Sequence, residues 1–73
     1  MGARSNYKVG RIRRDNEAAI LSAAETEFAE RGFSGAAIGR IAERANMPHN
    51  NIHYYFNSKK TLYNRLLTRI IKR

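Results

Sequence analysis

The amino-acid sequence predicts an all-α fold, and three observations lead to this prediction. Apolar residues recur every three or four positions in several segments, as they do along one face of a helix. Ten of the apolar residues are alanines, which suits close packing between helices. No segment alternates apolar and polar residues in the manner of a half-buried strand. Because 73 residues provide only one small core, we expect one domain of three packed helices and the start of a fourth.

The N-terminal segment differs from the rest of the chain. Residues 1–14 include five basic residues, no acidic residue, and few apolar residues without periodicity. Such a composition cannot bury enough apolar surface to order the chain. We therefore interpret residues 1–14 as a flexible, basic N-terminal arm, in which Arg14 lies next to the folded part.

The first helix is predicted to begin at Asp15. Asp15 or Asn16 supplies the side-chain oxygen that caps a helix N-terminus. Gly32 is placed to end the helix in a left-handed conformation, and Phe33 follows as the apolar contact after the stop. The residues that share the buried face of this helix are Ile20, Ala24 and Phe28.

The next two helices meet at a short turn, predicted at about residues 45–48. A second helix spans about 37–44, and a third spans about 48–55 and begins at Pro48. A steep helix crossing needs a small residue, which is Ala42, and a turn residue that tolerates positive φ, which is Asn46. Met47 and Ile52 then hold the third helix against the core. Residues 15–57 are therefore expected to form a helix-turn-helix domain.

The third helix has two dissimilar faces on a helical wheel. Its core side consists of Pro48, Ile52, Tyr55 and Phe56. Its outward side consists of His49, Asn50, His53 and Tyr54, with Asn51 on the flank. The outward set carries amide and imidazole groups, which can pair with base edges in the major groove of DNA. We expect this face to bind nucleic acid.

The fourth helix is predicted over residues 58–73, with Ser58 as its cap. Its apolar stripe consists of Leu62, Leu66 and Ile70, joined by Leu67 and Ile71. No Gly or Asn stops the helix before Arg73. We expect it to lead into a further domain that this chain does not contain.

The charge distribution indicates a polyanionic partner. The net charge is +8, made up of +5 over residues 1–14, −3 over 15–45 and +6 over 46–73. The absence of cysteine excludes disulfides and thiolate metal sites, and no apolar run is long enough for a membrane span. No secretory signal is recognisable, so we expect a cytoplasmic protein. We expect neither an enzyme nor a cofactor in a chain of this size.

Several alternatives remain open. The basic runs are also compatible with a solvated surface, or with a basic amphipathic module that binds RNA or anionic membranes. His49 and His53 have the spacing of a two-histidine metal site, but no glutamate follows the first histidine as the metalloprotease motif requires. We expect no metal and no catalytic residue, because no serine has a histidine or carboxylate at a suitable spacing.

Three segments together resemble the DNA-binding domain of TetR/AcrR-type repressors: 28–33 (FAERGF), 41–47 (IAERANM) and 51–59 (NIHYYFNSK). Their order and spacing carry the resemblance, which covers the chain from Asp15 onward. Within the family, the tyrosine pair before Phe56 is most similar to RutR-type regulators. The resemblance implies a homeodomain-like head. It also implies that a missing C-terminal domain forms a homodimer and binds a small-molecule effector, which relieves binding to a near-palindromic double-stranded operator.

The resemblance also assigns roles to single residues. Base reading falls to His49, Asn50, Asn51 and His53. Phosphate binding falls to Tyr54, Tyr55 and Lys59, and we add Arg14 from the arm. One departure from the family pattern concerns Ala36, which stands where relatives have a serine or threonine cap. Either Ser34 substitutes for this cap or the start of the second helix frays.

Overall fold

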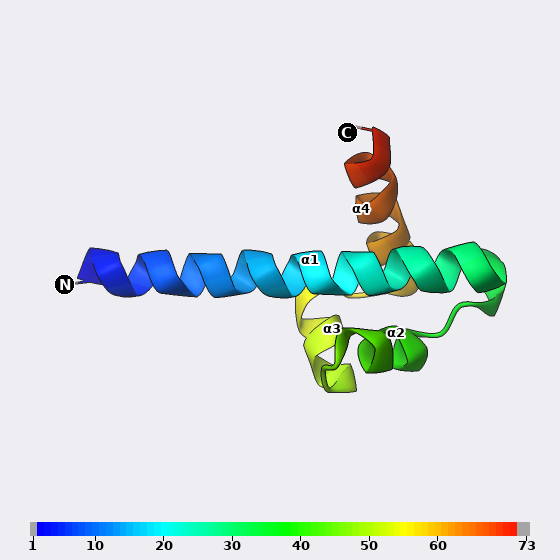
Figure 1. Ribbon diagram of the computed structural model, residues 1–73, viewed down its shortest axis with the longest axis horizontal. Coiled ribbons are helices and arrows are strands. Elements are labelled where there is room, and N and C mark those ends of the chain that lie inside the picture. Colours follow the sequence, from blue (N-terminus) through cyan, green and yellow to red (C-terminus); the bar gives the residue numbers. More distant parts are fainter. Residues whose placement is uncertain (1, 72–73) are drawn as a thin grey trace.

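The computed structural model describes residues 2–71, which form four helices and no strand. The helices are α1 (Gly2–Gly35), α2 (Ile38–Ala45), α3 (His49–Tyr55) and α4 (Lys59–Ile71). In Figure 1, α2 and α3 lie on one side of the long helix α1, and α4 extends away on the other side. The all-α prediction is confirmed, with α1 packed against both α2 and α4.

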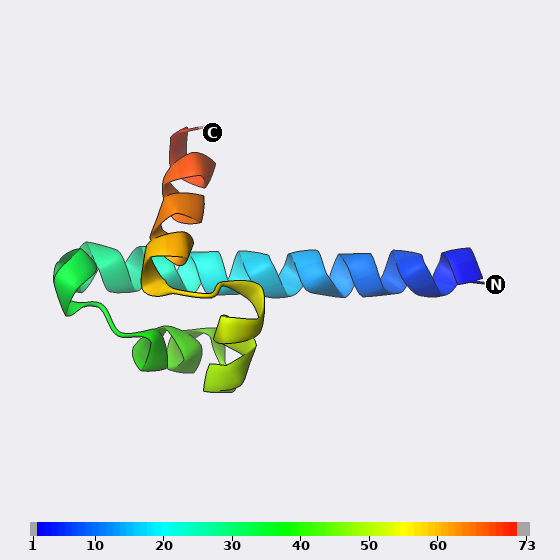
Figure 2. The same ribbon diagram turned by 180° about the vertical axis from the view of Figure 1, so that it is seen from behind.

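Helix α1 is much longer than predicted. It begins at Gly2 rather than at Asp15, so the irregular arm expected over residues 1–14 is helical along 2–14. Asp15 and Asn16 consequently lie inside the helix and cap nothing. The physical reason is that a helix extends from an existing turn at little cost, and Arg, Lys and Ala favour it. Figure 2 shows this N-terminal part reaching well beyond α3.

The C-terminal end of α1 is bent at Gly32, as the sequence suggests. Gly32 has φ 73° and ψ 174°, a conformation that favours glycine, but the helix resumes and ends at Gly35. Phe33 folds back as expected, with its ring centroid 6.0 Å from that of Phe28 and 5.2 Å from that of Tyr63. Gly32 therefore ends the long helical segment at a positive φ, as predicted, and a short helical turn follows it up to Gly35.

The core lies between α1 and the three shorter helices. Ile20, Ala24 and Phe28 are all buried, which confirms the predicted face of α1. The other helices contribute the buried residues Ile41, Ala42, Ile52, Leu62 and Leu66, with Phe56 from the α3–α4 connection. A fully buried Ile or Leu side chain stabilises a fold by about 1.5–3 kcal/mol. These contacts are what hold α3 in place.

Helix α4 begins as predicted. The hydroxyl of Ser58 accepts a hydrogen bond from the backbone N–H of Thr61 at 3.1 Å, which satisfies one of the free donors of the first turn. Leu62 and Leu66 are buried, whereas Ile70 and Ile71 are exposed. Along residues 2–71, none of the helices combines the length and the apolar character needed to cross a membrane.

Candidate nucleic-acid interface

The turn between α2 and α3 has the expected geometry. Asn46 has φ 58° and ψ 47°, the left-handed conformation predicted for this position. Its backbone N–H points back to the carbonyls of Ala42 and Glu43. The N–H of Met47 then donates to the carbonyl of Ala42 at 2.9 Å. These bonds satisfy the last carbonyls of α2 and turn the chain sharply into α3.

Helix α3 turns one face toward the core and the other toward solvent. Ile52 is fully buried and Phe56 almost so, whereas Tyr55 is half-buried. Pro48 is exposed, so its placement on the core side was wrong. The wheel does not extend to Pro48, because this residue is the extended N-cap (φ −63°, ψ 149°) and α3 begins at His49. The buried anchors fix the rotation of α3 about its own axis.

The residues predicted to read bases lie together on the outward face of α3. His49, Asn50, His53 and Tyr54 are exposed, and Asn51 is half-buried on the flank, as the wheel predicted. The rings of His49 and His53 stack with centroids 5.0 Å apart and an interplanar angle of 8°. Among the described residues, no group of three His, Cys, Asp or Glu side chains is arranged to hold a metal ion. The outward face thus presents imidazole and amide groups to solvent.

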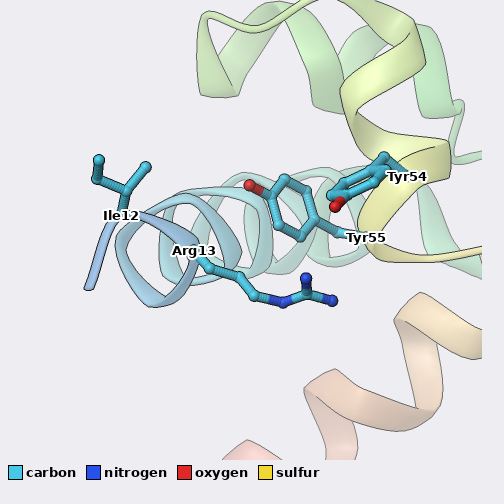
Figure 3. A pocket seen from close by; sticks show the side chains of 4 residues that line it. All are labelled: Ile12, Arg13, Tyr54 and Tyr55. Carbon is cyan, nitrogen blue, oxygen red and sulfur yellow. The ribbon is translucent and has the colours of Figure 1, made fainter. Parts of the chain in front are cut away.

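The two tyrosines at the end of α3 meet α1. Their ring centroids lie 5.1 Å apart, nearly perpendicular, and Tyr54 is 71% exposed. The hydroxyl of Tyr55 accepts a hydrogen bond from Nδ2 of Asn16 at 3.0 Å. Figure 3 shows Arg13 on α1 beside both rings, lining a shallow hollow with Ile12. No sequence pattern placed Arg13 or Asn16 beside α3, because both come near α3 only when α1 continues through residues 12–16.

Lys59 and Arg14 are placed less favourably than the tyrosines. The ammonium of Lys59 donates to the carbonyls of Ala36 at 3.2 Å and Ser34 at 3.4 Å, and it lies 4.7 Å from the ring centroid of Phe33. Lys59 is therefore turned toward the end of α1, and two of its three donors are used there. Arg14 is exposed, but on a helix it projects about 100° away from Arg13. The structure does not bring Arg14 to the tyrosines.

A buried ionic cluster holds α2 against α1, and sequence reasoning did not find it. The carboxylate of Glu27 is fully buried. Its Oε2 accepts hydrogen bonds from Nε of Arg40 at 2.6 Å and from the N–H of Ala37 at 3.1 Å. Its Oε1 accepts from Nε of Arg44 at 3.2 Å, and Arg31 lies 3.5 Å away. These contacts link α1 to the helix that precedes the turn.

Glu27 also contacts the start of α2. The N-cap residue of α2 is Ala37 rather than Ala36, and no side chain, that of Ser34 included, caps the first turn. Glu27 instead accepts a hydrogen bond from the N–H of Ala37 itself. Burial alone would raise the pKa of Glu27. Hydrogen bonds from Arg40, the Ala37 amide and Arg44 outweigh that effect, so its pKa lies below the ordinary value. Glu27 is therefore ionised at neutral pH.

Two known transcriptional regulators are similar to this chain in sequence. Over 53 residues, the chain is 45% identical to the HTH-type transcriptional regulator RutR of Escherichia coli K12, a match that covers 73% of this chain and 25% of RutR. Over 44 residues it is 36% identical to IcaR, the HTH-type negative transcriptional regulator of the biofilm operon icaADBC in Staphylococcus aureus strain Newman, covering 60% of this chain and 24% of IcaR.

The fold is also similar to a solved structure. The crystal structure of HlyIIR, a hemolysin II transcriptional regulator, superposes with a TM-score of 0.74 and 38% identity, covering 77% of this chain and 31% of HlyIIR. The chain spans about a quarter of the length of RutR and under a third of HlyIIR. Residues 20–66 match the family described as bacterial regulatory proteins, tetR family. The chain belongs to the tetR family of bacterial regulatory proteins.

Proposed function

We propose that this chain is a sequence-specific, double-stranded DNA-binding head of a bacterial transcriptional repressor. The observation that carries the proposal is the outward face of α3, where His49, Asn50 and His53 are exposed while Ile52 anchors the helix from behind. An α-helix fits the major groove, and amide side chains pair well with adenine there. The matched relatives are named as transcriptional regulators, and IcaR as a negative one.

Affinity and specificity come from different residues in this proposal. His49, Asn50 and His53 read base edges from the outward face of α3, and Asn51 joins them from the flank of that face. Tyr54, Tyr55 and Lys59 serve the phosphate backbone, and their hydroxyl and ammonium groups set the depth of α3 in the groove. The net charge of +8 adds a long-range attraction that does not depend on sequence. Backbone contacts thus supply most of the binding free energy, and α3 supplies discrimination.

The intact protein would act as a dimer on a near-palindromic operator. In this proposal, parts of the protein outside this chain dimerise and bind a small-molecule effector, which weakens operator binding in the bacterial cytoplasm. Two copies of α3 would then lie about 34 Å apart, one turn of the duplex, on the same face of DNA. The spacing of half-sites in the bound DNA is therefore a direct measure of the proposed symmetry.

Selection of duplexes from a random pool, followed by affinity measurements, tests this function. Asn50→Ala should weaken binding to the selected duplex by about 1–3 kcal/mol and binding to random duplex far less. Asn64→Ala, which removes an exposed amide from α4, is the matched control and should change neither. Equal losses on both kinds of DNA would refute base reading by α3. Preference for anionic vesicles over any duplex at the same salt concentration would refute DNA binding altogether.

A further inference from the structure

A cation lies against the two tyrosines where α1 passes the end of α3. The guanidinium carbon of Arg13 is 5.7 Å from the ring centroid of Tyr54 and 5.5 Å from that of Tyr55. Figure 3 shows the Arg13 side chain extended beside both rings, at the edge of the shallow hollow that it lines with Ile12. Arginine packed against aromatic rings loses little further side-chain entropy when it binds an anion. This guanidinium is therefore held in place before any partner arrives.

Glu17 fixes the other side of Arg13. Its Oε2 lies 3.4 Å from Nε of Arg13, one helical turn earlier, and its Oε1 lies 3.4 Å from Nη2 of Arg65 on α4. The Glu17 side chain is only 21% exposed, whereas that of Arg13 is 53% exposed. One carboxylate is thus shared by two arginines from different helices. The +2 charge of the arginines exceeds the −1 of Glu17, so the group keeps a net positive charge.

The ion pair with Glu17 does not involve the part of the Arg13 side chain that best binds an oxyanion. Glu17 contacts Nε, while the two terminal nitrogens carry four of the five N–H donors of a guanidinium. Those nitrogens form a planar fork that matches two oxygens of one phosphate. Tyr54 offers a hydroxyl on the same side of the molecule, next to the outward face of α3. A phosphate that approached Tyr54 would come within reach of this fork.

We propose that Arg13 binds a phosphate of the DNA backbone and that Glu17 is the positioning residue that holds Arg13 against Tyr54 and Tyr55. This inference rests on the proposed DNA binding and adds a contact to it. Arg13 takes the role that the sequence suggested for Arg14, because the Arg13 position faces α3 and the neighbouring one does not. Glu17 also makes this phosphate contact depend on Arg65, and hence on the position of α4.

The test measures affinity for a random-sequence duplex at several salt concentrations. Arg13→Ala should weaken binding several-fold and lower the slope of log affinity against log salt by about one unit. Arg13→Lys, which keeps the charge without the fork, should recover most of the slope and only part of the affinity. Arg14→Ala is the charge-matched control and should lower the slope much less. Equal effects of Arg13→Ala and Arg14→Ala would overturn the contact, since net charge alone would explain them.

A double-mutant cycle tests the positioning role. If Glu17 orients Arg13, Arg13→Ala should cost clearly less affinity in a Glu17→Gln background than in the wild type. Additive effects would overturn positioning, because Glu17 would then act through its charge alone. Thermal melts of each variant test whether unfolding, rather than a lost contact, causes a loss of affinity. A wild-type protein without affinity for any duplex at low salt would instead refute the proposed function, so the two failures can be told apart.

Discussion

Oε2 of Glu27 lies 2.6 Å from Nε of Arg40, across the contact between α1 and α2. Arg44, Arg31 and the N–H of Ala37 also surround this buried carboxylate. Because α2 leads directly through Asn46 into α3, the same contact sets where α3 lies relative to α1. Removing either the buried carboxylate or one of its arginine partners should destabilise the fold, because the remaining charge would be buried without its partner.

The first prediction concerns this cluster. Glu27→Gln keeps the shape of the side chain but leaves Arg40 and Arg44 facing a neutral amide, so the melting temperature should fall clearly. Glu30→Gln is the matched control: the Glu30 side chain is 54% exposed and pairs with Arg44. Its effect should be small because exposed pairs contribute little. Thermal melts followed by circular dichroism compare the variants, and equal stability of the two would contradict the structural role of Glu27.

The lowered pKa of Glu27 adds a pH dependence. Its folded-state pKa lies below the unfolded value, so its stabilisation is fully present above the ordinary glutamate pKa. The stabilisation is lost as pH falls through the lower, folded-state pKa. Melts from neutral pH to about pH 3 should therefore show a steeper loss of stability for the wild type than for Glu27→Gln. Parallel curves would show that Glu27 does not carry this proton linkage.

The features that could be predicted from the sequence are those that residues close together in the chain determine. Asn46 in the left-handed turn, Ser58 as the cap of α4 and the two faces of α3 all follow from spacing within a few positions. Each depends on backbone geometry that a short segment specifies by itself. The helix-turn-helix and the exposed set on α3 were predictable for this reason.

What the sequence could not predict depends on contacts between distant segments. Glu27 contacts Arg40 and Arg44, which lie 13 and 17 positions later in the chain, and no local pattern predicts that pairing. Lys59 turns toward the carbonyl of Ala36, 23 positions earlier, a contact that no short segment specifies by itself. The length of α1 was not predicted, because residues without an apolar pattern can extend a helix that is already formed.

The second prediction separates two roles of Lys59. Lys59→Ala should lower the slope of log affinity against log salt by about one unit, because a cation at the start of α4 attracts a phosphate. It should also lower the melting temperature, because the carbonyls of Ser34 and Ala36 lose their donor. Lys60→Ala, the exposed neighbour, controls for net charge. A lower melting temperature with an unchanged slope would mean that Lys59 serves only the fold.

The third prediction concerns the N-terminal part of α1. Deleting residues 2–11 removes Arg4, Lys8 and Arg11 but keeps Arg13 and the core, which begins at Ile20. The melting temperature should therefore change little. Affinity for both operator and random duplex should fall several-fold, and salt dependence should decrease, because each lost cation is one that can neutralise a phosphate. Titrations at matched salt measure both effects.

The helical form of this segment decides how it would act on DNA. Arginines on a flexible arm can enter a narrow minor groove, whereas a helix is better suited to placing them along the phosphate backbone. The triple variant Arg4→Gln, Lys8→Gln and Arg11→Gln keeps the chain length and removes only the charge. It should weaken binding as much as the deletion does. If the deletion weakens binding and the triple variant does not, the segment contributes through its shape; if neither does, it adds no affinity.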